Sequence, residues 1–283
     1  MLTEVDRIQM AAEDADAVAE MWQRLLDASR VREDQVPVLG ARRVVLSVGA
    51  SEVEILSPVG PGPVAAHVAA GNGGPFAAGL ATNDLAAVRR HLDRMNVAYV
   101  DNGDQLFAGP EDLAIDGLRV VITESRERTR VGLLNNLYEV THLTRDAHAT
   151  AASIARTFAL NQSHFVPIHS DPYGYDGYLT LFRPEALHRI EAIYPFDTSK
   201  TMGRFHRRAG DCLYMCYAET DDVGAVRARL ISEAPHGWTG DAAPVPDGLF
   251  IHPKALGGVM MGVSRTTHAW SWSGHPDWVK PAE

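Results

Sequence analysis

Apolar and polar residues alternate along several short segments of the chain, and amphipathic, alanine-rich stretches follow some of these runs. The first such pair is RIQMAAEDADAVAEMW from Arg7, in which the strand pattern gives way to helical spacing at Asp14. The same succession recurs in EVTHLTRDAHATAASIA from Glu139, with Asp146 at the transition. Because aspartate is a favourable N-cap residue, each segment is predicted to be a strand that leads directly into a helix.

Three further landmarks follow in the same order in both halves of the chain. A strand ends at a proline in EILSP from Glu54 and in EAIYP from Glu191, since proline cannot continue a strand ladder. GLATNDLAAVRRHL and YAETDDVGAVRARL each predict a strand that runs into a helix, capped near Asp84 and Asp222. LFAGP and LFIHP each precede glycine and a last apolar strand. Four matches in one order indicate an internal repeat.

Within each copy the pattern divides again into a strand, a helix and three strands. The sequence therefore predicts an α+β chain of four βαβββ units. A four-stranded sheet with one helix leaves one face uncovered, so two units should pair into a curled mixed β-sheet around a cavity. We expect an N-terminal domain over residues 1–125, a polar and charged linker, and a C-terminal domain over residues 133–283.

The composition is typical of a soluble protein, and it narrows the classes of partner. Of the 283 residues, 46% are hydrophobic and 22% are charged, which allows a sizeable core. No apolar run reaches the length of a membrane span and no signal peptide is recognisable, so we expect a cytoplasmic protein without a membrane partner. The net charge of −10 argues against nucleic acid, whose binding depends on lysine and arginine contacts to phosphates.

These landmarks resemble the vicinal oxygen chelate (VOC) superfamily, which includes glyoxalase I, methylmalonyl-CoA epimerase, fosfomycin and bleomycin resistance proteins, and type I extradiol dioxygenases. IHPKALGGV from Ile251 resembles the last hairpin of the epimerases, and VEILSP resembles their fourth strand. The length and the four-unit layout are instead similar to the extradiol dioxygenases. The resemblance implies two tandem glyoxalase-like domains, whose chemistry the fold alone does not decide.

In this superfamily a divalent metal is held by side chains on the first, fourth, fifth and eighth strands of a domain. In the N-terminal domain these positions fall on Arg7, Glu54, Ala77 and either Val121 or Ile122. Of these four positions, only Glu54 could bind a metal, and the arginine at the first position would repel a cation. We expect Arg7 and Glu54 to form an ion pair that fills this degenerate site, which would leave the domain structural or an interface.

In the C-terminal domain the same positions fall on Glu139, Glu191, Met215 and Gly262. The usual histidine and last glutamate are missing, so a divalent metal would have to rely on Glu139 and Glu191 with an incomplete ligand set, and the cofactor stays unknown. Two adjacent carboxylates cannot both ionise at low cost, so one pKa should rise. Such a pair suits proton abstraction beside a carbonyl. Alternatively, each glutamate is satisfied by a polar partner and does no chemistry.

Other residues near this cavity are candidates for contact with a substrate. Lys254, in the epimerase-like HPK element, and the basic cluster in GRFHRRAG could bind the phosphates of a CoA thioester, or an aromatic acid. The same basic cluster is also compatible with a solvated loop between strands. His164 is likewise compatible with an ordinary loop histidine. Aromatic and polar walls are typical of small-molecule pockets. The candidates are Met215, Tyr217, His164, Tyr178, Arg204, Arg208 and Lys254.

The C-terminal segment HAWSWSGHPDWVKPAE carries Trp270, Trp272 and Trp278 among polar residues. Indoles seldom stay exposed, so this tail is expected either to cover the mouth of the cavity or to pack against a second subunit of a homodimer. Either arrangement would bury the three rings.

Three hypotheses of function follow. The first is a superfamily isomerase or lyase that acts on a small oxygenated acid or its CoA thioester, with Glu139 and Glu191 as acid and base. The second is a metal-free small-molecule binding protein of the resistance type. The third is a ring-cleaving enzyme similar to the extradiol dioxygenases, with an altered metal site.

Overall fold

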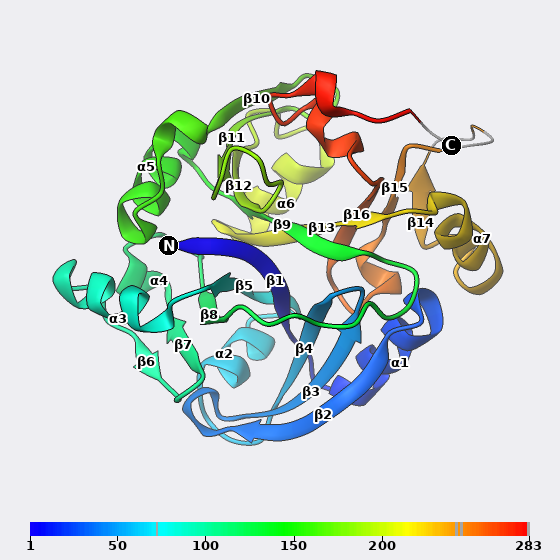
Figure 1. Ribbon diagram of the computed structural model, residues 1–283. Helices are drawn as coiled ribbons and strands as arrows, with labels where there is room; N and C mark the ends of the chain where they lie inside the picture. The colour runs from blue at the N-terminus through cyan, green and yellow to red at the C-terminus, as the bar shows by residue number, and fades with distance from the viewer. Residues whose placement is uncertain (72, 241–242, 244–245, 282–283) are drawn as a thin grey trace.

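The chain forms two eight-stranded sheets, one from each half of the sequence (Figure 1). The computed structural model describes residues 1–71, 73–240, 243 and 246–281. The strands of the N-terminal sheet are β1 (Leu2–Ala11), β2 (Ser29–Val36), β3 (Ala41–Val48), β4 (Ser51–Pro58), β5 (Gly74–Thr82), β6 (Val100–Asp101), β7 (Gln105–Ala108) and β8 (Val120–Glu124). Those of the C-terminal sheet are β9 (Asn136–Leu143), β10 (Val166–Ser170), β11 (Tyr175–Leu181), β12 (Arg189–Tyr194), β13 (Cys212–Thr220), β14 (Trp238–Gly240), β15 (Gly248–Ile251) and β16 (Met260–Arg265).

Both sheets have the same topology. The strand orders are β2-β3-β4-β1-β5-β8-β7-β6 and β10-β11-β12-β9-β13-β16-β15-β14. In each sheet the first strand of one unit pairs in parallel with the last strand of that unit and antiparallel with the first strand of the next. This arrangement confirms the predicted α+β fold of four βαβββ units in two tandem curled mixed sheets.

Aspartates begin the helix of every unit, as the sequence predicts. Asp14, Asp84, Asp146 and Asp222 each accept a hydrogen bond from the backbone N–H three residues later, which satisfies one of the unpaired donors of the first turn. No helix in the described part of the chain is long and apolar enough to span a bilayer. The helices are α1 (Ala15–Leu26), α2 (Pro63–Ala69), α3 (Leu85–Arg94), α4 (Pro110–Leu113), α5 (Ala147–Phe158), α6 (Thr201–Ala209) and α7 (Val223–Glu233), and short 3₁₀ turns are η1 (Pro37–Leu39), η2 (Gln162–His164), η3 (Pro253–Ala255), η4 (His268–Ser271) and η5 (Pro276–Trp278).

The two halves pack directly against each other through their central strands and helices. Strand β1 lies beside β9, α1 packs on α7 and α3 packs on α5, so that one hydrophobic core runs through both halves (Figure 1). Polar contacts cross the same boundary. The backbone N–H of Val5 donates to His188 Nδ1 at 3.2 Å, and Arg229 pairs with Asp27 at 2.7 Å.

The basic cluster in GRFHRRAG is helical, so its interpretation as a loop between strands is wrong. It forms most of α6, which ends at Gly210 in the left-handed region, with φ of 73°. Gly203 lies against the backbone of Asp197, where any Cβ would clash. Met202 and Phe205 pack with the apolar side chains of the C-terminal sheet. This apolar face anchors the segment as a helix instead of a free loop.

Candidate functional site

Strand register places the predicted site residues of the C-terminal sheet in two neighbouring rows. The row of Glu139 contains Arg189, Tyr217 and Gly262, and the row of Glu191 contains Thr141, Met215 and Met260. The four positions expected for a metal thus fall two in each row. Glu139 and Glu191 lie two residues apart in register on adjacent strands, as alternation predicts for two side chains that point to the same face.

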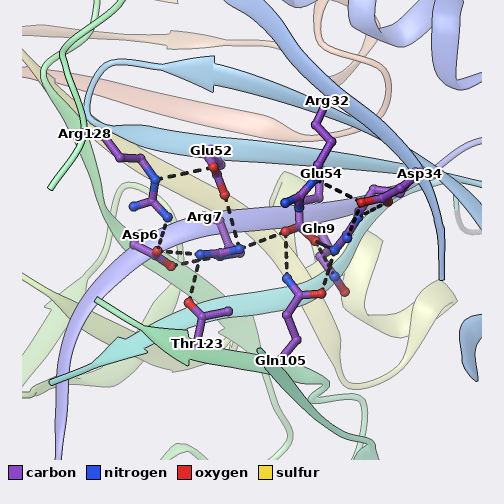
Figure 2. A network of polar contacts seen from close by, with 11 residues as sticks. Asp6, Arg7, Gln9, Arg32, Asp34, Glu52, Glu54, Gln105, Thr123 and Arg128 are labelled. Atoms are coloured by element: carbon purple, nitrogen blue, oxygen red, sulfur yellow. Dashed lines mark hydrogen bonds and ion pairs between the residues drawn. The ribbon is translucent and has the colours of Figure 1, made fainter. Parts of the chain in front are cut away.

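Arg7 occupies the corresponding interior of the N-terminal sheet (Figure 2). Its Nη1 donates to Glu54 Oε1 at 2.8 Å, which confirms the predicted ion pair. Its Nη2 donates to Asp6 Oδ2 at 2.7 Å and to Thr123 Oγ1 at 2.8 Å, and Glu52 lies 3.2 Å from Nη1. The buried guanidinium therefore has acceptors on several strands of the sheet, and no ligand is needed to satisfy it.

Glu54 is fully buried and surrounded by donors (Figure 2). Oε1 accepts from Arg7 and from Gln105 at 2.9 Å, while Oε2 accepts from Gln9 at 2.7 Å and from Arg43 at 3.2 Å. Burial alone would raise the pKa of Glu54, but the charges of Arg7 and Arg43 and the hydrogen bond from Gln9 hold it at about 2. Glu54 is thus a structural anion whose acceptor positions are used within the protein.

The C-terminal sheet has a similar ion pair with the two charges exchanged. The register that joins Arg7 to Glu52 in the first sheet joins Glu139 to Arg189 in the second. Arg189 Nε donates to Glu139 Oε2 at 2.5 Å, and both side chains are buried. The guanidinium also lies over the ring of Tyr138, 5.1 Å from its centroid. Arg189 therefore neutralises Glu139 and makes no ion pair with Glu191.

Glu191 has two side-chain hydrogen-bond partners among the described residues, Thr141 and Glu139, and neither is a cation. Thr141 Oγ1 donates to Glu191 Oε2 at 2.6 Å and lies 3.3 Å from Glu139 Oε1. Burial and, after it, the negative charge of Glu139 raise the pKa of Glu191 to about 8, against smaller opposing effects of Thr141 and Arg189. The raised pKa agrees with the expectation for two neighbouring carboxylates. Glu191 is consequently a mostly neutral acid at pH 7.

Glu191 lines a cavity of about 1190 Å³ whose walls come from both halves of the chain. Tyr175 and Tyr217 line it too, and their hydroxyls have no hydrogen-bond partner within the described ranges. Burial and then the charges of nearby carboxylates raise the pKa of both tyrosines, so both stay protonated. Phe76 and Arg119 of the N-terminal half also line it. The cavity is large enough for a small-molecule substrate.

Several of the predicted substrate-binding residues line this cavity. They are Met215, Tyr217, Arg208 and Lys254. Arg204 is not among its lining residues, because the side chain turns back to Thr201 and to the carbonyl of Ser199 on its own helix start. Glu139, although adjacent, is also absent from the lining residues described.

Two other predicted contacts lie elsewhere. Tyr178 packs edge-on against His148 of α5, with ring centroids 5.9 Å apart, because the strand alternation that turns Tyr175 inward turns Tyr178 toward the helix. His164 ends the short turn η2, where Nε2 lies 3.2 Å from Asn161 Nδ2. Neither residue reaches the cavity that Glu191 lines.

The tryptophan-rich tail packs within its own chain. Trp270 joins a buried cluster with Tyr138, and Trp272 and Tyr217 pack against it. Trp278 meets Trp270 edge-on at 4.8 Å. None of these three tryptophans is among the lining residues of the cavity of Glu191, but Trp272 packs against Tyr217, which lines it.

The donor atoms near Glu191 do not fit a tightly held divalent metal. The described residues contain no group of three or more His, Cys, Asp or Glu side chains placed to hold one. Met215 and Met260 offer only thioethers in the row of Glu191, and Glu139 is already neutralised by Arg189. Hard and borderline cations require several oxygen or nitrogen donors, which this row lacks.

No protein-family model and no curated protein sequence matches the chain. Among solved structures, a triple mutant of 4-hydroxymandelate synthase from Streptomyces coelicolor matches with a TM-score of 0.67 and 12% identity, over 93% of each chain. A methylmalonyl-CoA epimerase variant from the same organism covers 44% of this chain and 99% of its own, at 18% identity and a TM-score of 0.40. The epimerase from Mycobacterium tuberculosis covers 47% and 89%, at 21% identity and a TM-score of 0.38. The first likeness extends over nearly the whole chain, and it shows that both halves together have the fold of that synthase, in agreement with the predicted pair of glyoxalase-like domains.

Proposed function

We propose that the protein is an isomerase or lyase that moves a proton on a carbon atom next to a carbonyl group of a small oxygenated acid or its thioester. The observation that carries the proposal is Glu191, a buried carboxyl group with a raised pKa in the wall of a large cavity. Perturbed carboxyl groups in cavities are typical of acid–base catalysis. The matching glutamate of the N-terminal sheet has the opposite shift, so the raised pKa belongs to the local arrangement of charges.

Glu191 serves as both base and acid in this proposal. With a pKa of about 8, roughly a tenth of it is ionised at pH 7, and this form is a stronger base than an ordinary carboxylate. It takes the proton from the carbon atom, so that the C–H bond breaks, an O–H bond forms, and the electron pair moves onto the carbonyl oxygen as an enolate. Delivery of the proton to a different carbon atom completes an isomerisation, whereas elimination of a leaving group completes a lyase reaction.

Tyr175 and Tyr217 are placed to stabilise the enolate oxygen. Both line the cavity with hydroxyl groups that no described residue uses, and both are held protonated. A phenol that donates to a developing oxyanion in a partly buried site lowers the barrier, because it needs no reorganisation of solvent. The apolar side chains of Met215 and Phe250 in the same wall limit access of water to the reacting atoms.

Glu139 is a positioning residue in this account. It lies beside Glu191 and shares a side-chain hydrogen bond with it, while the hydroxyl of Thr141 donates to Glu191 Oε2 and lies 3.3 Å from Glu139 Oε1. When Glu191 is protonated, it donates to the carboxylate of Glu139. The charge of Glu139, held by Arg189, thereby keeps the proton on Glu191 until a substrate is bound. This refines the expectation of two equivalent acid–base glutamates.

Proton exchange in D₂O tests the proposal without knowledge of the natural substrate. A panel of 2-oxo acids and acyl thioesters is incubated with the protein, and loss of the signal of the proton on carbon is followed by ¹H NMR. We expect exchange of at least one compound by the wild type and a loss of about 10²-fold or more in Glu191→Gln. Glu219→Gln is the matched control, because Glu219 is a half-buried carboxyl of the same sheet that accepts from the backbone of Thr267, outside the cavity.

Two results would overturn the proposal. Exchange that persists in Glu191→Gln at the wild-type rate would remove Glu191 from the chemistry. Tight binding of a compound from the panel without any exchange would show a binding protein of the resistance type instead.

A further inference from the structure

The cavity of Glu191 is completed by the N-terminal half of the chain. Phe76, on β5, and Arg119, directly before β8, line it together with the C-terminal residues. The N-terminal domain was expected to be structural or an interface, because its own interior is filled by Arg7 and Glu54. Its outer edge nevertheless forms part of the wall of the other domain's cavity.

Two glycines bring this edge of the N-terminal half onto the cavity. Gly117 has φ of +71°, and a Cβ there would lie 1.8 Å from the carbonyl oxygen of Asp211. Gly74 has φ of +128°, and a Cβ there would lie 2.7 Å from the carbonyl oxygen of Gly258. Both positions need glycine for the backbone angle and for the close approach. The contacts fix the segment that carries Arg119 against the C-terminal half.

Arg119 is a half-buried cation without a counter-ion. Its guanidinium lies 5.2 Å from the centroid of the Phe76 ring, and it makes no side-chain hydrogen bond or ion pair with any residue that the structure describes. Glu111 and Asp112 act on it only at longer range, and burial is the main cause that lowers its pKa. A desolvated guanidinium presents a planar set of donors suited to carboxylate and phosphate groups.

The other charged residues of the cavity add to the same field. Arg208, Lys200 and Lys254 line it from the C-terminal half; Lys200 lies in the field of Asp197, whereas Arg208 and Lys254 have no acidic partner among the described residues. The acidic lining residues are Glu191, which is mostly neutral, and Asp211, which already accepts from His206 at 2.8 Å. A positive cavity in a protein with a net charge of −10 is a feature that favours anionic ligands.

We propose that the cavity binds an anionic substrate across the boundary between the two halves, with Arg119 of the N-terminal half holding a carboxylate or phosphate group remote from the reacting carbon. The placement of the reacting carbon beside Glu191 rests on the proposed function, whereas anion binding by Arg119 does not. Lys254 and Arg208 contribute charge from the C-terminal half. Arg119 is therefore a specificity-determining residue that the degenerate half supplies to the other half.

Isothermal titration calorimetry with two simple anions tests this inference on the full chain. Succinate represents a carboxylate and inorganic pyrophosphate a phosphate group, while succinamide is the uncharged control. We expect at least one anion to bind to the wild type and succinamide not to bind. Arg119→Gln should weaken the anion about ten-fold or more, since it removes a charge-assisted contact. Arg119→Lys keeps the charge and should lose less.

Arg94→Gln is the matched control, because Arg94 is an exposed residue of α3 with the same charge and no place in the cavity. It should bind the anion as the wild type does, and thermal melting shows whether each variant is folded. Binding by folded Arg119→Gln that equals the wild type, or no binding of either anion to the wild type, would overturn the inference. Glu191→Gln separates the two proposals: it should keep anion binding even if no compound undergoes proton exchange.

Discussion

The interiors of the two sheets begin from the same strand position and reach opposite electrostatic states. In the N-terminal sheet, Glu54 accepts from two arginines and two glutamines, and its pKa falls to about 2. In the C-terminal sheet, Glu191 has hydrogen bonds with Thr141 and Glu139 but pairs with no arginine, and its pKa is raised to about 8. The comparison shows that a buried carboxyl becomes a structural anion or a neutral acid according to which neighbour carries the positive charge.

The decisive exchange concerns the adjacent pair of strands. Arg7 on β1 is close to Glu52 and Glu54 on β4, so one guanidinium serves two carboxylates. In the second sheet the arginine is on β12, where Arg189 lies next to Glu139 on β9. Glu191 therefore has the negative charge of Glu139 beside it, and the arginine pairs with Glu139 instead of with Glu191. The same polar residue types therefore produce one closed interior and one that is open to a ligand.

The largest expected effect is on stability, and it tests the closed interior. Glu54→Gln leaves Arg7 and Arg43 buried without their shared acceptor, and breaking such a network is expected to lower the free energy of unfolding by about 3–5 kcal/mol. Glu191→Gln removes the cost of holding a buried carboxyl group protonated at pH 7, so this variant should be at least as stable as the wild type. Urea denaturation of both variants measures the difference. Equal losses in the two variants would contradict the contrast.

Exchanging the charges of the open interior should convert it toward the closed one. In the double variant Glu139→Arg, Arg189→Glu, an arginine stands beside Glu191 as Arg7 stands beside Glu54. The pKa of Glu191 should then fall below its ordinary value, and the proposed proton exchange should fall about 10²-fold, because the carboxylate becomes a weak base. The NMR exchange assay measures the rate, and circular dichroism confirms the fold. An unchanged rate in the folded variant would refute the role given to the ion pair.

The two glutamates should have opposite effects on stability as pH changes. Glu191 has a raised pKa in the folded state, so its contribution is complete below pH 4.5 and is lost as pH rises to about 8. Glu54 has a lowered pKa, so its contribution is complete above pH 4.5 and is lost as pH falls toward 2. Each slope should be at most about 1.4 kcal/mol per pH unit.

The difference in unfolding free energy between the wild type and each glutamine variant isolates these two contributions. For Glu191→Gln the difference should decrease between pH 4.5 and 8, and for Glu54→Gln it should decrease from pH 4.5 downward. Slopes of the same sign for both variants would show that the two interiors are electrostatically alike.

The smallest expected effect concerns the hydroxyl that lies close to both carboxylates. Thr141→Val removes the donor to Glu191 and nearly preserves the volume, so the pKa of Glu191 should rise by about half a unit. The pH dependence of proton exchange reports this shift. Thr180→Val is a matched control, because Thr180 is equally buried but donates to the backbone carbonyl of Ile190. A pKa that falls in Thr141→Val would contradict the role of Thr141 as a donor to Glu191.

Local patterns were sufficient to predict the architecture. Alternation followed by an aspartate cap is a property of short segments, and it identified the strands and helices that Asp14 and Asp146 join. The pairing of Arg7 with Glu54 was also predictable, because strand periodicity turns both side chains inward. The exchange of Glu52 for Arg189 is also present in the repeat, two residues before each aligned glutamate, at a position outside those that hold a metal in the family.

The composition of the cavity wall was not predictable in the same way. Arg119 reaches it because Gly117 packs against Asp211, a contact between distant segments that no local periodicity encodes. Tyr178 was predicted to contact a substrate because it is close in sequence to other aromatic residues. Its direction depends instead on the register of β11, which turns it toward His148. Alternation predicts directions within a strand, whereas the packing of loops and domains decides which side chains meet.

The most direct test of the central claim is the pKa of Glu191 itself. ¹³C NMR of the side-chain carboxyl carbons in glutamate-labelled protein, with Glu191→Gln to assign the signal, gives this value across a pH titration. The account predicts a midpoint near pH 8 for Glu191, while Glu54 stays ionised down to about pH 2. A midpoint of Glu191 near the ordinary value of 4.5 would contradict it.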